Sequence, residues 1–596
     1  MIVSTSAFDN GLPGLSFTHY SGIQDTVPLL ERDQTFTLSD FMILNHGKHT
    51  WRWGGDFRRI QINTETDKNG RGTFIFTGLN TAGTGNGGPS AGAGYDFADF
   101  LLGLPQQTSV QYGCSATGTC GGASDDSYHF RGNSWDLFGQ DEWRLRGNLT
   151  FNLGLRYEYV SPFTEINNRI VNLDAAPGFS AVAPVQPDQT GAFSGRFPAT
   201  LVKPDRNNFA PRVGIAWKAK GKTVIRAGYG INYNTRAYQS IVQQLAFQPP
   251  FSFTQTNIES PTTSLTLQNG FPAAPAGTIT NNYGVDPNYR LGYVQIWNAD
   301  LQQEITPTLL LNVSYNGTKG TRLDIVEAPD RTANGLLLAN VQPFLFENSL
   351  GGSTAHSGTV RLRKRLQRGL AVSGSYTWSK SIDDASSIGD GSTLVAQDAF
   401  NLSAERGLSS FDQRHRFTGD YTWELPLGHE KRWLSQKSAL RDVFGDWQWT
   451  GDWTIASGTP FSPRIVGDIT DVSRGSNGTL RPDVTGIPVE LSNPSITEWF
   501  NPAAFASTTD ASGVTHFGNA RRNSIIGPGS LVFDMAMTKS FPLRENRSIE
   551  LRAQASNVFN KPQFATIDTN FNSPTFGQVT SVGAMRTIQF TGRFRF

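Results

Sequence analysis

The chain has 596 residues and a formal charge of +1, from 51 Lys and Arg against 50 Asp and Glu. Only 17% of its residues are charged and 11% are aromatic, which excludes a disordered chain and provides no electrostatic surface for nucleic acid. A mean hydropathy of −0.34 and the lack of any run of about 18 apolar residues exclude a helical membrane protein. An all-β protein remains, either soluble or a transmembrane barrel.

The N-terminal part of the chain holds the first expected strands and a linker. Residues 1–5 lack the basic start and apolar stretch of a signal peptide, so we expect a fragment or a truncated gene product. Residues 80–94 are glycine-rich and predict a flexible linker, and residues 98–103 predict a short helix or turn. We expect one barrel domain over 1–596, with N-terminal barrel strands and the linker in 1–127 and the main hairpins in 128–596. The expected N-terminal strands are about 12–20, 33–44, 48–62, 72–78 and 106–112.

The chain has 2 cysteines, Cys114 and Cys120, in a loop rich in small polar residues. Their spacing does not match the paired CxxC sets of zinc sites. We expect a local disulfide formed in an oxidising compartment, with two free thiols as the alternative.

From residue 149 onward, apolar and polar residues alternate with a period of two. Such alternation places one set of side chains on each face of a sheet. The segments run about 10 to 14 residues, enough for a tilted strand to cross a bilayer, which needs about 9–11. The clearest are 149–159, 225–233, 309–315, 370–378, 417–425, 447–455 and 549–555.

The connections between these segments alternate between short and long. The clear short turns are 146–148, 218–222, 306–307, 367–369 and 544–546. The long polar stretches are about 161–206, 236–291, 324–354, 382–410, 458–530 and 560–583. Membrane barrels have short turns on the periplasmic side and long loops outside, whereas soluble sandwiches have no reason to separate loops by length.

Tyrosine and tryptophan gather near the ends of the apolar sets, as in the aromatic girdles of barrels. The opposite sets carry amides and charges, which a dry core would not accept. We therefore predict an up-and-down transmembrane β-barrel with about 16–18 antiparallel strands. Leu153, Ile225, Val313 and Trp449 should face lipid, and their neighbours Asn152, Arg226, Asn312 and Gln448 the lumen.

Four stretches carry a family likeness: residues 134–158, 405–417, 556–560 and 587–596. The first reads SWDLFGQDEW followed by NLGLRYE, the second contains ERG and FDQRHRF, the third is SNVFN and the last is TIQFTGRFRF. Together they resemble the barrel portion of TonB-dependent outer-membrane receptors of the Oar-like branch. The last stretch resembles the C-terminal signal read by the barrel-assembly machinery, which implies that role for Ile588, Phe590, Phe594 and Phe596. Arg593 and Arg595 should then point inward or lie at the interface.

The resemblance implies a location in the outer membrane of a Gram-negative bacterium and energised uptake, or in the Oar type a role with larger exported cargo. Family members have about 22 strands, a plug domain and an N-terminal segment that contacts TonB. No plug is visible here and about four strands are missing, so TonB is expected as a partner only of a plug-bearing full-length form. The other expected partners are outer-membrane lipid, the assembly machinery and an unknown ligand.

Three patterns carry possible metal or phosphate chemistry, and each has a simpler interpretation. His46 and His49 lie in a tight turn without an acidic or Cys partner nearby in sequence, so we expect a solvated turn. Residues 83–88 match GxGxxG but are followed by Pro89, not by a helix. Asp383, Asp384 and Asp390 could bind Ca²⁺, but lack EF-hand spacing, so we expect a solvated loop and neither metal nor cofactor.

Alternating arginines predict a basic stripe in the lumen. The set is Arg361, Arg363, Arg365, Arg414 and Arg416. The stripe could steer anionic ligands, or it could be a wall that pairs with acidic residues of a plug. No GxSxG elbow is present and the 8 histidines are scattered, so we do not expect an enzyme. The leading hypothesis is a TonB-dependent receptor barrel for a large ligand; the alternative is a passive porin or a structural or adhesive surface barrel.

Overall fold

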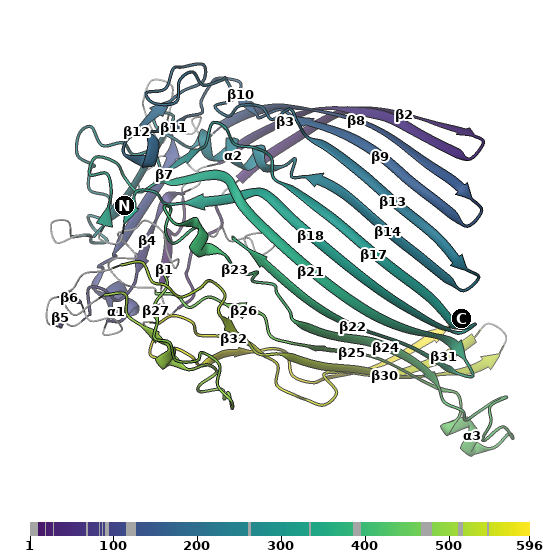
Figure 1. Ribbon diagram of the computed structural model, residues 1–596. Helices are drawn as coiled ribbons and strands as arrows, with labels where there is room; N and C mark the ends of the chain where they lie inside the picture. Colours follow the sequence, from purple (N-terminus) through teal and green to yellow (C-terminus); the bar gives the residue numbers. More distant parts are fainter. Residues whose placement is uncertain are drawn as a thin grey trace.

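The computed structural model describes residues 10–17, 20–27, 29–66, 69–82, 84–85, 88–89, 94–114, 127–259, 264–332, 335–384, 395–465, 480–509, 516–544, 547–571 and 573–596. Long strands form a curved sheet, and the long connections gather at the end opposite to the short turns (Figure 1). Within the described ranges, no helix has the length and apolarity needed to cross a membrane.

The curved sheet contains 18 strands, in agreement with the predicted 16–18, and its strand pairs are antiparallel except for β16 with β21. Three of them, β10, β16 and β23, are short, and the other fifteen form an antiparallel meander in chain order. The meander strands are β2 (Leu29–His46), β3 (His49–Thr66), β8 (Ser127–Arg146), β9 (Leu149–Val160), β13 (Phe209–Lys220), β14 (Thr223–Tyr233), β17 (Tyr293–Thr306), β18 (Leu309–Glu327), β21 (Leu345–Gln367), β22 (Leu370–Asp383), β24 (His415–Glu424), β25 (Trp447–Ala456), β30 (Ser530–Arg544), β31 (Arg547–Ser556) and β34 (Thr587–Arg595).

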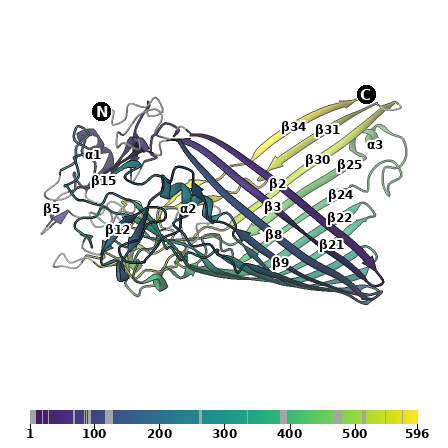
Figure 2. The ribbon, with the colours of Figure 1, turned by 90° about the horizontal axis from the view of Figure 1, so that it is seen from above.

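The barrel is open between β2 and β34. Among the described residues, β2 pairs only with β3, and β34 only with β31. Figure 2 shows the two edge strands diverging toward the end that carries the short turns. Because an odd number of antiparallel strands separates them in the meander, β2 and β34 run in the same direction, and pairing them directly would require a parallel ladder.

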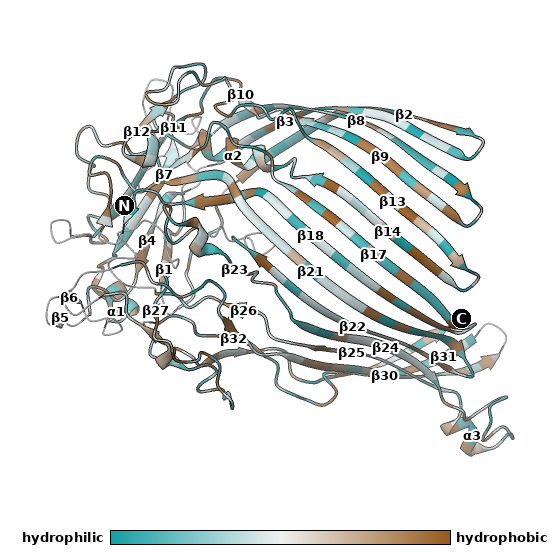
Figure 3. Cartoon of the chain, viewed as in Figure 1, coloured by the Kyte–Doolittle hydropathy of each residue, from teal (hydrophilic) through white to brown (hydrophobic). Residues whose placement is uncertain are grey.

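Two adjacent rows of residues across the sheet reveal its two faces. One row, from β13 to β30, is Trp217, Ile225, Leu301, Val313, Val360, Tyr376, Phe417, Ile455 and Leu531. The neighbouring row is Ala216, Arg226, Asp300, Ser314, Thr359, Thr377, Arg416, Ala456 and Ser530. Directly paired residues share a face, so the first row is the lipid-facing side and the second the lumen side, and the bands of Figure 3 repeat this alternation along each strand.

A second sheet corrects the prediction for residues 12–20, 72–78 and 106–112. Strands β1 (Gly14–Phe17), β4 (Asn69–Phe76), β7 (Gln107–Gly113) and β15 (Ser252–Ile258) form a separate 4-stranded sheet. These are short strands whose apolar residues, such as Phe76 and Val110, are buried among the loops instead of exposed toward lipid. The prediction was wrong because a period of two is common to both kinds of strand.

The long connections fold together into what we call the loop cap: the described parts of residues 161–208, 234–292, 328–344, 384–414, 457–529 and 557–586. Its largest apolar cluster includes Tyr238, Ile241 and Leu245 together with Tyr128 and Phe130 of β8. Tyr128 and Phe130 share a face with the lumen residue Asp136, so the cap packs against the inner wall of the sheet.

Short elements order both the loop cap and the described parts of residues 77–106. The helices are α1 (Asp96–Leu102) and α2 (Ala237–Ala246), with 3₁₀ turns at Pro177–Phe179, Leu402–Glu405 and Pro502–Ala504. α1 confirms the predicted short helix, and it ends at Gly103, whose φ of 71° suits glycine. The short strands are β5 (Thr84–Gly85), β6 (Gly88–Pro89), β10 (Thr164–Glu165), β11 (Asn172–Ala175), β12 (Val182–Val185), β16 (Tyr283–Val285), β19 (Arg331–Thr332), β20 (Gly335–Leu336), β23 (Gly407–Leu408), β26 (Pro460–Phe461), β27 (Asp483–Val484), β28 (Phe505–Ala506), β29 (Ile525–Ile526), β32 (Phe564–Ile567) and β33 (Val579–Val582).

One connection at the opposite end is long. Residues 425–446 join β24 to β25 at the end of the short turns and contain α3 (Ala439–Phe444), which lies near the C-terminus of the chain (Figure 1).

Candidate functional site: inner wall and loop cap

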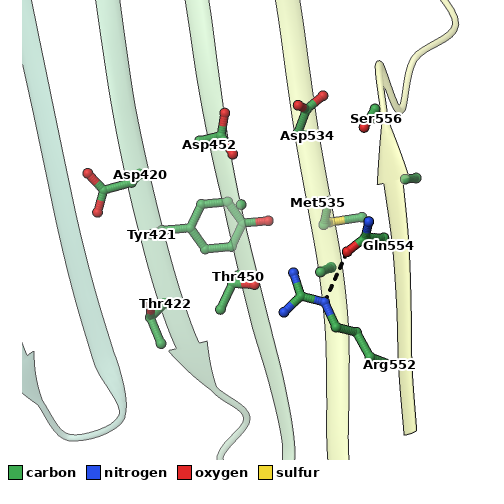
Figure 4. Close-up of a pocket in the computed structure, with 13 residues that line it drawn as sticks. Asp420, Tyr421, Thr422, Thr450, Asp452, Asp534, Met535, Arg552, Gln554 and Ser556 are labelled. Atoms are coloured by element: carbon green, nitrogen blue, oxygen red, sulfur yellow. Dashed lines mark hydrogen bonds between the residues drawn. The ribbon is translucent and has the colours of Figure 1, made fainter. Parts of the chain in front are cut away.

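Three aspartates stand side by side on the lumen face of neighbouring strands. Asp420 pairs in register with Asp452, and Asp452 with Asp534 (Figure 4). Asp534 accepts a hydrogen bond from the backbone N–H of Asn557 at 2.7 Å. Among the described residues, Asp420 and Asp452 have no hydrogen-bond or ion-pair partner. Like charges in direct register destabilise a sheet, so this acidic ladder needs solvent or a cationic group to offset the repulsion.

The acidic ladder borders a hollow of about 400 Å³ that also has a polar floor. The Arg552 Nε donates to Gln554 Oε1 at 3.1 Å, and Gln554 donates to Gln589 at 2.9 Å. One part of the wall of the hollow therefore carries the carboxylates of the acidic ladder, and the adjoining part carries the guanidinium of Arg552 and the amide of Gln554. Such a surface binds polar or charged groups, not apolar ones.

The predicted basic stripe borders this ladder. Arg361, Arg363 and Arg365 alternate on β21 and are exposed on the lumen face. Arg363 lies in the same row as Asp420, with Ser373 between them. Two strand spacings of about 4.8 Å separate the positive and negative positions, so the wall carries both signs within roughly 10 Å.

The structure divides the predicted stripe into two places. Arg416 lies on the polar row with Arg226 and Asp300, whereas Arg414 reaches Asp412 at 3.7 Å near the loop cap. The predicted lumen residues Arg226 and Asn312 both bind the carboxylate of Asp300. The Arg226 Nη1 atom lies 3.5 Å from this carboxylate. The lumen thus holds a network of charges, not a single basic stripe.

A second hollow, the basic chamber, lies where β22 and β23 meet the loop cap. It has a volume of about 840 Å³ and is lined by Lys380, Arg406, Arg414, Arg481, Arg521 and Arg522, with Glu490 as a carboxylate. Lys380 and Arg521 are exposed, and neither forms an ion pair within the described parts of the chain. The excess of cations gives this chamber a positive potential.

Two buried arginines hold the wall of the basic chamber together. Arg481 binds Glu405 through both terminal nitrogens, at 2.9 and 3.0 Å, and its Nε donates to the carbonyl of Ala520 at 2.9 Å. Arg522 binds the carboxylate of Asp383 and donates to the carbonyl of Glu405 at 2.9 Å. Both guanidiniums are almost fully buried and paired, so their role is to join the connections 384–414 and 457–529 to each other and to the end of β22.

Buried carboxyl groups lie where the outer ends of β18 and β21 meet the loop cap. The Tyr283 hydroxyl donates to Glu347 at 2.5 Å, Asn348 donates to Glu327, and the backbone N–H of Leu338 donates to Asp330 at 2.7 Å. Burial raises the pKa of Glu327, Asp330 and Glu347 to about 7 in each case. Asp324, which accepts from Tyr289, adds its charge to the rise in the pKa of Glu347.

We expect the loop cap to loosen as the pH rises through about 7. The pKa of Glu347 is raised from 4.5 to about 7, so its protonated form favours the fold; this stabilisation is complete below pH 4.5 and is lost as the carboxyl ionises. For this buried group the loss is on the order of 3 kcal/mol. The hydrogen-exchange protection factors of residues 327–348, in which the intrinsic rise of amide exchange with pH is divided out, should be lower at pH 8 than at pH 5, and Glu347→Gln should reduce that difference. Glu304→Gln, at an exposed carboxylate near a short turn, is the matched control. Equal protection factors at both pH values would contradict the prediction.

The remaining predicted sites are placed as follows. His49 Nδ1 lies 2.7 Å from the carboxylate of Asp141 on β8, and the His49 ring stacks between Trp51 and Trp143. His49 therefore has an acidic partner, but this partner lies 92 residues away in the sequence. Asp384 pairs with Arg406 at 3.4 Å, and Asp390 and residues 83, 86 and 87 lie outside the described residues. Within the described ranges, no group of three or more His, Cys, Asp or Glu is arranged to hold a metal.

Two predicted features lie at strand ends. Cys114 is buried after β7, and Cys120 lies outside the described residues, so the disulfide between them stays a prediction. Ile588, Phe590, Phe594 and Phe596 are all exposed and alternate along β34. Arg595 reaches Glu550 at 3.1 Å, and Arg593 is in register with Glu550, on the face opposite to these apolar side chains.

Comparison with known proteins identifies the family. Residues 2–589 match the outer membrane beta barrel domain. A solved structure with the same fold is the outer membrane transporter YddB from Escherichia coli, at 11% identity and a TM-score of 0.50, covering 98% of this chain and 58% of that one. The ferripyoverdine receptor of Pseudomonas aeruginosa (9% identity, TM-score 0.43, 96% and 50% covered) and the ferric yersiniabactin uptake receptor FyuA from Yersinia pestis (8%, 0.39, 96% and 54%) are also similar.

Comparison with curated proteins gave no match. The chain spans a little over half the length of the solved structures that it resembles. The family match over residues 2–589, the strand topology and the sequence resemblance all indicate the same structure, an outer-membrane β-barrel. The chain belongs to the outer membrane beta barrel domain family and lies in the outer membrane of a Gram-negative bacterium.

Proposed function

We propose that this chain is the barrel of a TonB-dependent outer-membrane receptor that takes up a large ligand, and that it does not act as an enzyme. The observation that carries this proposal is the loop cap, which packs onto the inner wall through Tyr128 and Phe130. A passive porin needs an open, water-filled passage, whereas a receptor closes its mouth over a ligand.

The charged lumen supports the same proposal. The acidic ladder and the arginines of β21 present both signs side by side, a pattern that a plug domain with complementary charges would match. In the basic chamber, the exposed Lys380 and Arg521 favour a ligand that carries negative charge.

The test uses the full-length protein purified from the outer membrane of its host. In planar bilayers we expect no steady current, because cap and plug close the passage. In cells, a chemical crosslinker should join the protein to TonB, and this adduct should be missing from a strain without TonB. A steady ohmic current together with no TonB adduct would overturn the proposal in favour of a passive porin or a structural surface barrel.

A further inference from the structure

The connection between β24 and β25, which we call the rim segment (residues 425–446), lies on the lipid-facing side of the barrel. Lys539 of β30 is in register with Trp447 of β25, and both share a face with Ile455 and Leu531 of the apolar row. The rim segment covers Lys539 so completely that only 3% of this residue is exposed. Because these strands have their short-turn ends here, the segment lies at the periplasmic edge of the lipid-facing surface.

Three backbone carbonyls of the rim segment accept hydrogen bonds from the Lys539 ammonium. They belong to Asp442 at 2.6 Å, Val443 at 3.1 Å and Gly445 at 2.7 Å. The Trp447 indole donates to the same Val443 carbonyl at 3.0 Å. An unpaired lysine on the lipid side is unfavourable, so the ammonium and the C-terminal end of α3 satisfy each other.

The outer side of the rim segment is apolar and has no cover. Leu440, Val443 and Phe444 of α3 follow the i, i+3, i+4 spacing of one helix face, and each is more than half exposed. Trp433, at 53% exposure, precedes α3 in the same segment. These four large apolar side chains lie beside the lipid-facing surface of the barrel and extend that surface, so they do not form a separate patch in contact with water.

Cations accompany this apolar patch. The Arg432 guanidinium lies 5.2 Å from the centre of the Trp433 ring, and Lys437 is exposed without an ion-pair partner among the described residues. Tryptophan and basic side chains are the residues that anchor polypeptides at the level of lipid headgroups, with rings in the acyl boundary and charges at phosphate.

We propose that the rim segment is a membrane anchor that inserts Trp433, Leu440, Val443 and Phe444 into the periplasmic leaflet of the outer membrane. Arg432 and Lys437 lie at the phosphates of its phospholipids. The anchor fixes the height in the bilayer of β24, β25 and β30, the three strands that carry the acidic ladder.

The test folds the chain into vesicles of phosphatidylethanolamine and phosphatidylglycerol that contain phosphatidylcholine with brominated acyl chains, which quench nearby tryptophan. The emission of Trp433 is obtained as the difference between the natural chain and Trp433→Phe. We expect the bromolipid to quench most of this difference emission. Trp499, in the loop cap, is the matched control: the emission lost in Trp499→Phe should not be quenched.

A second variant asks whether the apolar face drives insertion. The triple variant Leu440→Ser, Val443→Ser, Phe444→Ser should lower the quenching of Trp433 at least twofold, while heat-modifiable migration on gels shows that the barrel is folded. The proposal would be overturned if bromolipid left the Trp433 emission unchanged. This result would mean that the segment lies in water or against a second copy of the protein. Unchanged quenching in the triple variant would overturn the role of α3.

Discussion

Replacing Glu405 with alanine should open the loop cap without unfolding the barrel. The change leaves the guanidinium of Arg481 buried without its carboxylate, and removing one partner of a buried ion pair costs about 3–5 kcal/mol. The connections that Glu405 and Arg481 join, 384–414 and 457–529, are not part of the strand meander, so the loss should remain local. Limited proteolysis should cut residues 480–509 at least tenfold faster in the variant, while heat-modifiable migration of the barrel on gels stays the same.

Glu490→Ala is the matched control for this prediction. Glu490 lines the same basic chamber, but it is exposed and its removal leaves no buried charge alone. Its proteolysis should match that of the natural chain. Equal cleavage rates for Glu405→Ala and Glu490→Ala would mean that the buried pair does not hold the cap.

The strands of the main barrel could be predicted because lipid and water impose a period of two on each of them. The predicted segment 149–159 is β9 (Leu149–Val160), and 447–455 is β25 (Trp447–Ala456). The short turns at 146–148 and 367–369 were also predicted correctly, since a polar break between two alternating runs is a local signal. Local signals therefore determine the part of the fold that faces the bilayer.

The second sheet and the charge pairs could not be predicted in this way. β4 alternates as a barrel strand does, and only the burial of Phe76 among the loops distinguishes it. Glu405 and Arg481 are 76 residues apart, and Asp383 and Arg522 are 139 apart, so no spacing in the sequence indicates that they meet. The acidic ladder likewise arises from the register of three strands, each of which contributes a single aspartate.

The rim segment illustrates a third limit. Its α3 has only six residues, too few for a helical period to stand out, and the prediction of short periplasmic turns gave no reason to look for a helix there. A signal was nevertheless present: Trp433, Leu440, Val443 and Phe444 are large apolar residues in a connection that should be polar. Apolar residues in a predicted loop therefore deserve a search for the surface that they cover.

Deletion of Phe596 should lower the amount of barrel inserted in the outer membrane severalfold. Phe594 and Phe596 stack with ring centres 5.9 Å apart, and Phe596 is 91% exposed at the end of the lipid-facing stripe of β34. Since β34 is an edge strand among the described residues, its outer side is free to contact an assembly factor, and the resemblance of this stretch to a C-terminal signal names the barrel-assembly machinery as that factor.

The measurement is a pulse-chase experiment that follows the heat-modifiable, folded form in isolated outer membranes. Met585→Ala is the control, because Met585 is exposed just before β34 but lies outside the apolar stripe, and it should insert at the normal rate. The shortened chain should accumulate unfolded in the periplasm, because it lacks the ring that the machinery recognises. The deletion removes no hydrogen bond of the β31–β34 ladder, which ends at Arg595. Insertion of the shortened chain at the normal level and rate would show that Phe596 is not the residue that the machinery reads, and that the exposed stripe of β34 serves lipid contact alone.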